Sequence, residues 1–338
     1  MTATVEPSFA RSRVEELQAS AVAIEHELAR VIVGYEDVLR GVLVALLAGG
    51  HALLEGAPGL GKTLLVRTLS EVLHLRYSRI QFTPDLMPSD IIGTDVLVDS
   101  DSGERRFVFK HGPIFGNLLL ADEINRASPK TQSALLEAMQ ERTITVGTTD
   151  YALPEPFFVL ATQNPIEMAG TYPLPEAQLD RFLFKLKLGS PSAEQLTEIL
   201  NRTTSVDQPR VRRLAGPDAL LEMRHVARQV FIAPHVMNYA VRLILATYPA
   251  RDADAPQAVR QFVRYGASPR AGQALVIAAK VTAFLSGRFN VSYQDIRNVA
   301  RASLRHRLIL NIEAEVAGTD VDSIVEAVIH HVPEEHRQ

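Results

Sequence analysis

Residues 56–63 of this chain of 338 residues read Gly56-Ala57-Pro58-Gly59-Leu60-Gly61-Lys62-Thr63. The stretch fits the pattern G-x-x-x-x-G-K-[ST], whose glycines let the backbone curl until successive N–H groups point at phosphate oxygens. It follows an apolar run and opens a helical pattern over 62–74, whose N-terminus adds a positive end. In such a loop Lys62 reaches the β- and γ-phosphates and the Thr63 hydroxyl binds Mg²⁺. The alternative is a glycine turn that happens to precede a helix, which this context disfavours.

Short apolar runs alternate with helical patterns on both sides of the loop. Alternation of this kind is typical of a parallel sheet covered by helices. Amphipathic spacing over 14–32 predicts a further helix that packs on the same domain. The five runs that we predict to be buried strands are 51–55, 77–82, 117–121, 157–162 and 182–188.

Two segments between the predicted strands have the pattern of β-hairpins. In 95–109, two apolar runs flank a turn at 99–103, and in 143–156 apolar residues alternate with threonine before a glycine. We expect both hairpins to project from the sheet.

The composition changes near residue 190, after which strand-like runs nearly disappear. We therefore predict an α/β nucleotide-binding domain with its N-terminal helix over 1–190 and a helical domain over 191–338. Residues 203–209 and 248–257 read as loops of the second domain. Its predicted helices are 220–230, 235–247, 269–285, 293–310 and 321–331.

The composition excludes several kinds of site. The chain has no cysteine, which rules out disulfides, thiolate metal sites and a cysteine nucleophile. Lys and Arg number 35 against 39 Asp and Glu, and this balance argues against wholesale binding of nucleic acid, although a local basic groove remains open. The early stretch without ionised groups, 41–54, is shorter than the roughly 20 residues of a membrane span, and residues 1–13 lack the apolar core of a secretion signal. We therefore expect a cytoplasmic protein without a membrane span.

Two carboxylates end the apolar run 117–121. Asp122, at the carboxyl end of that strand, can hold Mg²⁺, while Glu123 points elsewhere and can polarise an attacking water. Acidic residues end many strands, so the pair alone is a weak signal. It becomes strong beside the phosphate loop, because both would lie at the carboxyl edge of one sheet.

Three polar residues are candidates for recognising the γ-phosphate. Asn164 could hydrogen-bond the γ-phosphate or the attacking water, or it could simply form a turn. Arg181 could reach into a neighbouring subunit's site as an arginine finger, or pair locally with Asp180 or Glu176. Arg270 opens a predicted helix of the second domain, where it could report nucleotide state or remain solvated.

The order of these motifs resembles that of AAA+ ATPases of the MoxR family over almost the whole chain. The resemblance implies a core sheet of order 5-1-4-3-2, a helical lid formed by the second domain, and hairpins that match the helix-2 and pre-sensor-1 insertions. The strings that carry it are Val31-Ile32-Val33-Gly34 for the adenine cap, 112–115 and 121–127 for Walker B, 161–165 for sensor 1, 174–182 for the arginine finger and 268–271 for sensor 2.

The resemblance also implies the roles of individual residues. ATP would contact Val33, Gly34 and the loop from Gly56 to Leu64, and Mg²⁺ would contact Thr63 and Asp122. The residues that it makes catalytic are Lys62, Glu123, Asn164, Arg181 and Arg270.

Members of this family form rings, usually hexamers, in which each ATP lies between subunits and Arg181 would come from the neighbour. An arginine supplied in this way is worth ~10³–10⁵ in rate, so a monomer should hydrolyse ATP poorly. The resemblance further implies a chaperone-like motor that matures or activates a partner complex, often with a von Willebrand factor type A domain protein and in some cases inserting a metal. The chain has no Cys/His cluster for a transition metal, and His330 and His331 read as a polar pair at a helix end.

Two other functions stay open. A motor that remodels nucleic acid would need basic residues on its hairpins, but 143–156 contains Asp150 and Glu155 and neither Lys nor Arg. The second open function is a nucleotide-responsive scaffold in which turnover is incidental.

Two residue assignments also stay open. Arg126 could serve a neighbouring site or cap the helix predicted over 128–140. Gln81 or Thr83 could be the polar residue that holds Glu123 inactive.

Overall fold

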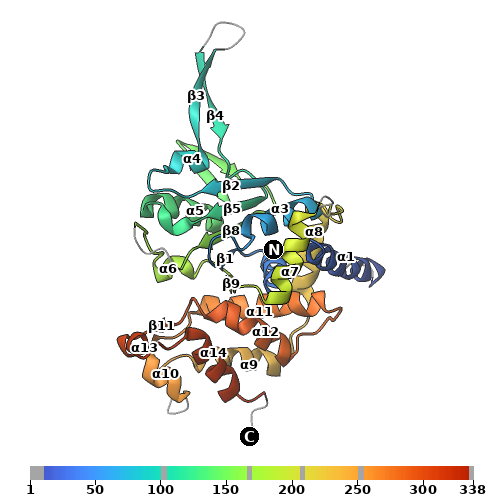
Figure 1. Ribbon diagram of the computed structural model, residues 1–338, viewed down its shortest axis with the longest axis vertical. Coiled ribbons are helices and arrows are strands. Elements are labelled where there is room, and N and C mark those ends of the chain that lie inside the picture. The colour runs from blue at the N-terminus through green and yellow to red at the C-terminus, as the bar shows by residue number, and fades with distance from the viewer. Residues whose placement is uncertain (1–10, 100–104, 166–169, 206–209, 250–254, 335–338) are drawn as a thin grey trace, which may run out of the picture.

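The computed structural model describes residues 11–99, 105–165, 170–205, 210–249 and 255–334 (Figure 1). Its centre is a parallel five-stranded sheet in the order β2-β5-β8-β1-β9. Counted along the chain as core strands one to five, this is the predicted order 5-1-4-3-2, and the labels differ only because four hairpin strands are numbered as well. The strands are β1 Ala52–Glu55, β2 Tyr77–Gln81, β5 Leu118–Asp122, β8 Phe158–Gln163 and β9 Phe184–Lys187.

The central strands are apolar without alternation because both faces of the sheet are covered. Every residue of β5 is buried, and successive residues enter opposite cores. Leu118 and Leu120 belong to a core shared with the helices α1 Arg11–Ala29, α2 Glu36–Ala48 and α3 Lys62–Val72. Leu119 belongs to the core on the other face, which contains residues of α5 Pro129–Glu141.

The helices at the start of the chain differ from their prediction in two ways. Helix α1 buries the expected apolar stripe but ends at Ala29, before a turn in which Gly34 has a φ of 77°. Helix α2 was not predicted. All its residues from Val42 to Ala48 are buried, so this part of the sequence has no amphipathic pattern. A helix that is apolar on all sides belongs inside a protein, and α2 packs on α1, α8 and α11.

Both predicted hairpins are present. Strands β3 Gly93–Asp99 and β4 Arg105–His111 pair antiparallel after the short helix α4 Pro88–Ile92, and Figure 1 shows them projecting far from the sheet. Most of the turn predicted at 99–103 lies outside the described residues. Strands β6 Thr143–Val146 and β7 Thr149–Ala152 form the second hairpin, in which Gly147 has a φ of 60°.

The rest of the described chain is largely helical. Figure 1 shows α9 to α14 as a layer below the sheet, while α7 and α8 lie beside α1 and α3. The apolar core on the sheet face covered by α1, α2 and α3 continues into these helices. The helices are α6 Glu176–Leu179, α7 Ala193–Thr204, α8 Pro217–Gln229, α9 Pro234–Leu245, α10 Gln257–Phe262, α11 Pro269–Leu285, α12 Tyr293–Leu304, α13 Ile312–Ala317 and α14 Val321–His331.

Two boundaries in this helical part correct the prediction. The helix expected over 293–310 ends at Leu304, because Ile309–Leu310 form a strand, β11, that pairs with β10 Val263–Tyr265. The loop expected over 203–209 begins inside α7, which continues to Thr204.

Candidate functional site

The glycine-rich loop joins β1 to α3 at the carboxyl edge of the sheet. Gly59 and Gly61 have φ values of 82° and 79°, a conformation that favours glycine. A β-carbon at either position would meet nothing within 4 Å, so the requirement is conformational and the space over the loop is open. Gly56 differs, because a β-carbon there would lie 2.7 Å from Cβ of Leu188.

Lys62 opens α3 and is half-buried against the loop. Its Nζ donates to the carbonyl oxygen of Gly56 at 2.7 Å. Burial lowers the pKa of Lys62, and the charges of Asp122 and Glu123 oppose that shift. The ammonium is therefore within the electrostatic reach of both carboxylates. Thr63 follows with an exposed side chain, as does Leu64.

Asp122 is buried at the end of β5, and each of its carboxylate oxygens has a partner. Thr162 Oγ1, from the fully buried end of β8, donates to Oδ1 at 2.6 Å. Arg79, on β2, donates from Nη2 to Oδ2 at 2.8 Å. A guanidinium thus occupies one side of the carboxylate that a metal would use.

Glu123 shares Thr162 with Asp122 through its backbone, but its carboxylate has partners of its own. Its backbone lies in the left-handed region, with φ of 57° and ψ of 50°, and its N–H donates to Thr162 Oγ1 at 2.8 Å. Its Oε2 accepts from Gln81 Nε2 at 2.7 Å and from Arg126 Nη1 at 3.2 Å. Left-handed backbone at a residue other than glycine is costly and is concentrated at functional sites.

These contacts decide between several alternatives. Of Gln81 and Thr83, it is Gln81 that contacts Glu123. Arg126 lies in the short 3₁₀ turn Ile124–Arg126 and pairs with its own chain's Glu123. The helix-capping role considered for Arg126 is wrong, because Ser128 is the N-cap of α5 and accepts from the N–H of Thr131.

Sequence reasoning missed Arg79 and Thr162. Arg79 stands two residues before Gln81 on β2, so the two side chains share a face of the strand. Thr162 lies opposite Leu54 in the parallel register, near the end of β1. Their positions near the carboxyl ends of strands are the signal in the sequence that could have identified both residues as part of the site. Asn164 directly follows β8 and is also buried.

The segment proposed to cap the adenine contacts the helical part of the chain. Val33 is partly buried, and a β-carbon on Gly34 would collide with the side chain of Gln195 on α7. Gln195 Nε2 donates to the carbonyl oxygen of Gly34 at 3.4 Å, and the Tyr35 hydroxyl donates to the carbonyl of Gly189 at 3.1 Å. Gln195 was not predicted, although its place in the capping box that starts at Ser192 fixes the first turn of α7.

Arg181 and Arg270 lie together. Both line a cavity of about 350 Å³, and the residues that line it include none from the loop 56–63. The side chain of Arg181 makes no hydrogen bond or ion pair with any residue that the structure describes. Local pairing with Asp180 is not observed, because that carboxylate accepts from Arg307 Nε at 2.7 Å. Arg270 Nη1 lies 4.0 Å from Asp180 Oδ2.

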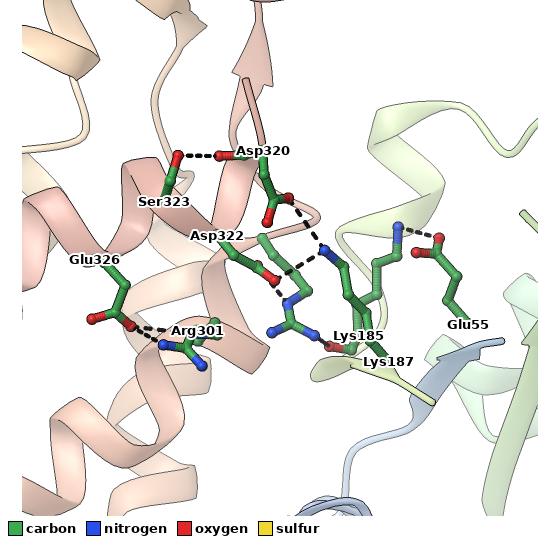
Figure 2. Close-up of polar contacts among 9 residues, drawn as sticks. Glu55, Lys185, Lys187, Arg301, Asp320, Asp322, Ser323 and Glu326 are labelled. Carbon is green, nitrogen blue, oxygen red and sulfur yellow. Dashed lines mark hydrogen bonds and ion pairs between the residues drawn. The ribbon is translucent and has the colours of Figure 1, made fainter. Parts of the chain in front are cut away.

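A chain of charges links the loop to the helices below the sheet (Figure 2). Glu55, which directly precedes the loop, pairs with Lys185 Nζ of β9 at 2.6 Å. Lys187 of the same strand pairs with Asp322 of α14 at 2.9 Å. Arg305, after α12, lies 2.9 Å from Asp322 and donates to the carbonyl of Lys185 at 3.3 Å. The loop and the helical layer therefore share strand β9.

No helix in the described part of the chain is long and apolar enough to cross a membrane. No group of three or more His, Asp or Glu side chains there is placed to hold a metal ion.

Comparisons with known proteins agree with this architecture. The family model described as "ATPase family associated with various cellular activities (AAA)" matches residues 51–184, and that of the AAA lid domain matches 256–328. A crystal structure of a presumed ATPase from Cytophaga hutchinsonii has a TM-score of 0.88 and 41% identity, over 95% of this chain and 97% of that one.

Two curated relatives have names that contain MoxR. Chaperone MoxR1 of Mycobacterium tuberculosis is 44% identical over 306 residues, which cover 90% of this chain and 80% of that protein. Protein MoxR of Methylorubrum extorquens is 30% identical over 93% of this chain and 95% of its own length. The identity extends over the sheet, the loop and the helical layer alike, and on these grounds the chain belongs to the MoxR family of AAA+ ATPases.

Proposed function

We propose that this protein hydrolyses ATP with Mg²⁺ at a site that two copies of the chain complete. The observation that carries the proposal is a separation of charged groups. Lys62, Asp122 and Glu123 gather at one edge of the sheet, while the Arg181 side chain has no polar partner among the described residues and lines a different cavity with Arg270. A complete site needs both sets.

The loop suits a triphosphate. Gly59 and Gly61 bend the backbone over open space, and Lys62 would exchange its contact with the Gly56 carbonyl for phosphate oxygens. Thr63 and Asp122 offer the oxygen donors that Mg²⁺ prefers. Bound there, the metal supplies charge neutralisation at the β- and γ-phosphates. Asp122 would first give up Arg79.

The other groups at the edge would act on water and the γ-phosphate. Glu123 would orient and polarise the attacking water, with Gln81 holding its carboxylate until a partner or nucleotide state releases it. Asn164 would hydrogen-bond the γ-phosphate or that water. Val33 and Gly34 would cover the adenine, and Gln195 would tie them to α7.

Arg181 and Arg270 would act on the ATP of a neighbouring copy. Charge that develops on the transferred phosphoryl group is stabilised by such guanidinium groups. If each copy supplies its arginines to the next copy around a closed ring, usually of six copies in this family, each nucleotide would lie between two subunits. The absence of a polar partner for the Arg181 side chain among the described residues supports a role in trans for Arg181 over a local one, and Arg270 lines the same cavity.

The wider role that we propose is that of a chaperone-like motor. Chaperone MoxR1 is a relative of this chain over most of its length, and an AAA lid model matches 256–328. We propose residues 191–338 as a lid that moves with nucleotide state against a client complex, with a von Willebrand factor type A domain protein as partner. Because ATP is a cytosolic nucleotide, we place this activity in the cytoplasm.

Two substitutions test the proposal. Lys62→Ala should abolish ATP binding measured by calorimetry, because it removes the cation from the loop. Glu123→Gln should bind ATP with unchanged affinity and lose hydrolysis by about 10³-fold, since only the water-activating group changes. Full turnover by Glu123→Gln would show that another group activates water. A scaffold with incidental turnover would keep its cellular function in Glu123→Gln, whereas a motor would lose it.

A further inference from the structure

The chain on either side of Arg181 is held by a single buried arginine of the helical layer. Arg307, which follows α12, donates from Nε to Asp180 Oδ1 at 2.7 Å and from Nη2 to the Asp180 carbonyl at 3.0 Å. The same Nη2 donates to the carbonyl of Phe182 at 2.6 Å, and Nη1 donates to that of Leu183 at 3.1 Å. Arg307 thus contacts the residue before Arg181 and the two residues after it.

Other residues of the helical layer bind the same short segment. Ser268 Oγ lies 3.1 and 3.2 Å from the two carboxylate oxygens of Asp180. Ser268 occupies the N-cap position of α11, but its side chain caps no backbone N–H. His306 Nε2 donates to the carbonyl of Phe182 at 3.0 Å. Asp180 and Phe182 are therefore fixed by groups that come from both α11 and the end of α12.

Arg181 is the exception within this segment. Its backbone is bracketed by the contacts of Arg307, while its side chain lines the 350 Å³ cavity and has no polar partner in the described part of the chain. A fixed backbone under a free guanidinium is what a residue needs if its target lies outside its own subunit. Groups that act in a transition state must be held within about 0.5 Å by their supporting contacts.

We infer that Arg307, assisted by Ser268, is a positioning residue that presents Arg181 to the neighbouring active site. The inference rests on the proposed function, in which Arg181 acts in trans. It adds that the lid of one copy controls hydrolysis in the next copy, and that damage to this contact spares the damaged subunit's own loop. Asp180 is the carboxylate through which both lid groups hold the turn.

The test uses full-length protein and Arg307→Lys, which keeps the charge but loses the guanidinium fork that reaches several acceptors. Arg307→Lys should lower ATP hydrolysis by about tenfold or more, because a misplacement of about 1 Å can cost 10²-fold. Its affinity for ATP, measured by calorimetry, should stay that of the wild type. A loss of ATP affinity would overturn the inference, since it would place the damage in the subunit's own loop.

Mixing subunits separates positioning from a merely structural role. Arg307→Lys has an intact loop and a displaced Arg181, whereas Lys62→Ala has no working loop and an intact Arg181. Mixed rings of the two should recover hydrolysis, as should mixed rings of Arg181→Ala and Lys62→Ala. If Arg181→Ala mixtures recover and Arg307→Lys mixtures do not, the inference is wrong and the proposed function stands. If neither recovers, the trans site itself is wrong.

Two more variants keep the result interpretable. Ser268→Ala removes only the hydroxyl on Asp180 and should lower hydrolysis by about threefold to tenfold, again with unchanged ATP affinity and with recovery in mixed rings. It serves even if Arg307→Lys folds poorly. Arg301→Met is the matched control on α12, because the Arg301 side chain is 51% exposed and pairs with Glu326, away from Asp180. Equal losses in Ser268→Ala and Arg301→Met would contradict the inference.

Discussion

Two aspartates of this protein are each paired with an arginine, and the two pairs differ in burial and in number of contacts. At the loop edge, Arg79 makes one contact with Asp122 and its side chain is 47% exposed. Below the sheet, Arg307 is 3% exposed and binds the carboxylate and carbonyl of Asp180 together with the carbonyls of Phe182, Leu183 and Ser303.

The difference separates a replaceable counter-ion from a fixed one. Exposed pairs contribute little because water and salt compete with them, whereas removal of one partner of a buried pair leaves an uncompensated charge. In the proposed function, Arg79 would leave Asp122 when Mg²⁺ binds, whereas Arg307 would stay on Asp180 and support Arg181.

The largest expected effect comes from the residue that the fixed pair supports. Arg181→Ala should lower hydrolysis by about 10³–10⁵-fold, because it removes the guanidinium that stabilises the transferred phosphoryl group. Affinity for ATP should change little, since Arg181 does not line its own subunit's loop. Steady-state hydrolysis and calorimetry measure the two quantities. Arg301→Met provides the control, and a large loss of ATP affinity in Arg181→Ala would place Arg181 beside its own nucleotide.

A second experiment compares the two pairs directly. Arg307→Met should lower the free energy of unfolding by about 3–5 kcal/mol, since Asp180 would lose its buried partner. Arg79→Met should cost less, about 1 kcal/mol, because water can replace the exposed Arg79 guanidinium and Thr162 still donates to the Asp122 carboxylate. Denaturant unfolding of both variants measures the difference. Similar costs for the two variants would remove the distinction between them.

The sequence predicts the loop edge far better than the contacts of Arg307. The loop 56–63 and the pair Asp122 and Glu123 are local strings at the ends of strands, so their spacing alone indicates their chemistry. The hairpins followed from local strand and turn patterns, and the order of the sheet followed from a family resemblance that covers nearly the whole chain. By contrast, Asp180 lies 88 residues from Ser268 and 127 from Arg307, and no local pattern encodes contacts at those separations.

Two other misses have physical causes. Arg79 and Thr162 reach Asp122 across neighbouring strands, and only the register of the sheet brings them together. The early end of α12 arises because the apolar residues Ile309–Leu310 continue the helical pattern but pair instead with β10. Tertiary contacts, not local preference, decide both cases.

A third experiment concerns the buried hydrogen bonds of His51, which hold the strands beneath the loop and which we expect to stay in place when the Arg79–Asp122 pair opens. His51, just before β1, donates from Nε2 to the Met139 carbonyl at 3.1 Å and accepts at Nδ1 from the N–H of Val159 at 3.0 Å. The second bond needs the neutral ring, because Nδ1 can accept only while it carries no proton, and burial lowers the pKa of His51 to about 4.

The unfolded chain therefore binds the proton first as the pH falls from about 6.5 to about 4, so stability falls with pH over that window. The loss should reach about 3 kcal/mol at pH 4. Unfolding at several pH values, in wild type and in His51→Gln, isolates this contribution from that of His306, whose pKa burial also lowers. An unchanged pH profile in His51→Gln would contradict the assignment.

The smallest expected effect concerns the replaceable pair. Arg79→Ala should lower the Mg²⁺ concentration needed for tight nucleotide binding by about twofold to fivefold, since Asp122 no longer has to give up a cation. A fluorescent ATP analogue titrated with Mg²⁺ measures the midpoint without relying on turnover. Arg67→Ala is the matched control, because Arg67 pairs with Glu71 on the exposed side of α3. A rise in the midpoint would show that Arg79 assists metal binding.

Strand β9 is only four residues long, yet it lies between two parts of the proposed site. Through Lys185 it contacts Glu55 at the entrance to its own phosphate loop (Figure 2), and the turn that leads into it carries Arg181, which we propose acts on the nucleotide of the next copy. Strand β9 lies at the edge of the sheet and pairs with β1, the strand that leads into the loop. We expect occupancy of one pocket to alter turnover on one side of the ring only, so that subunits fire in a set direction and hydrolysis depends on ATP concentration with a Hill coefficient above one. A hyperbolic dependence would indicate that each pocket works alone.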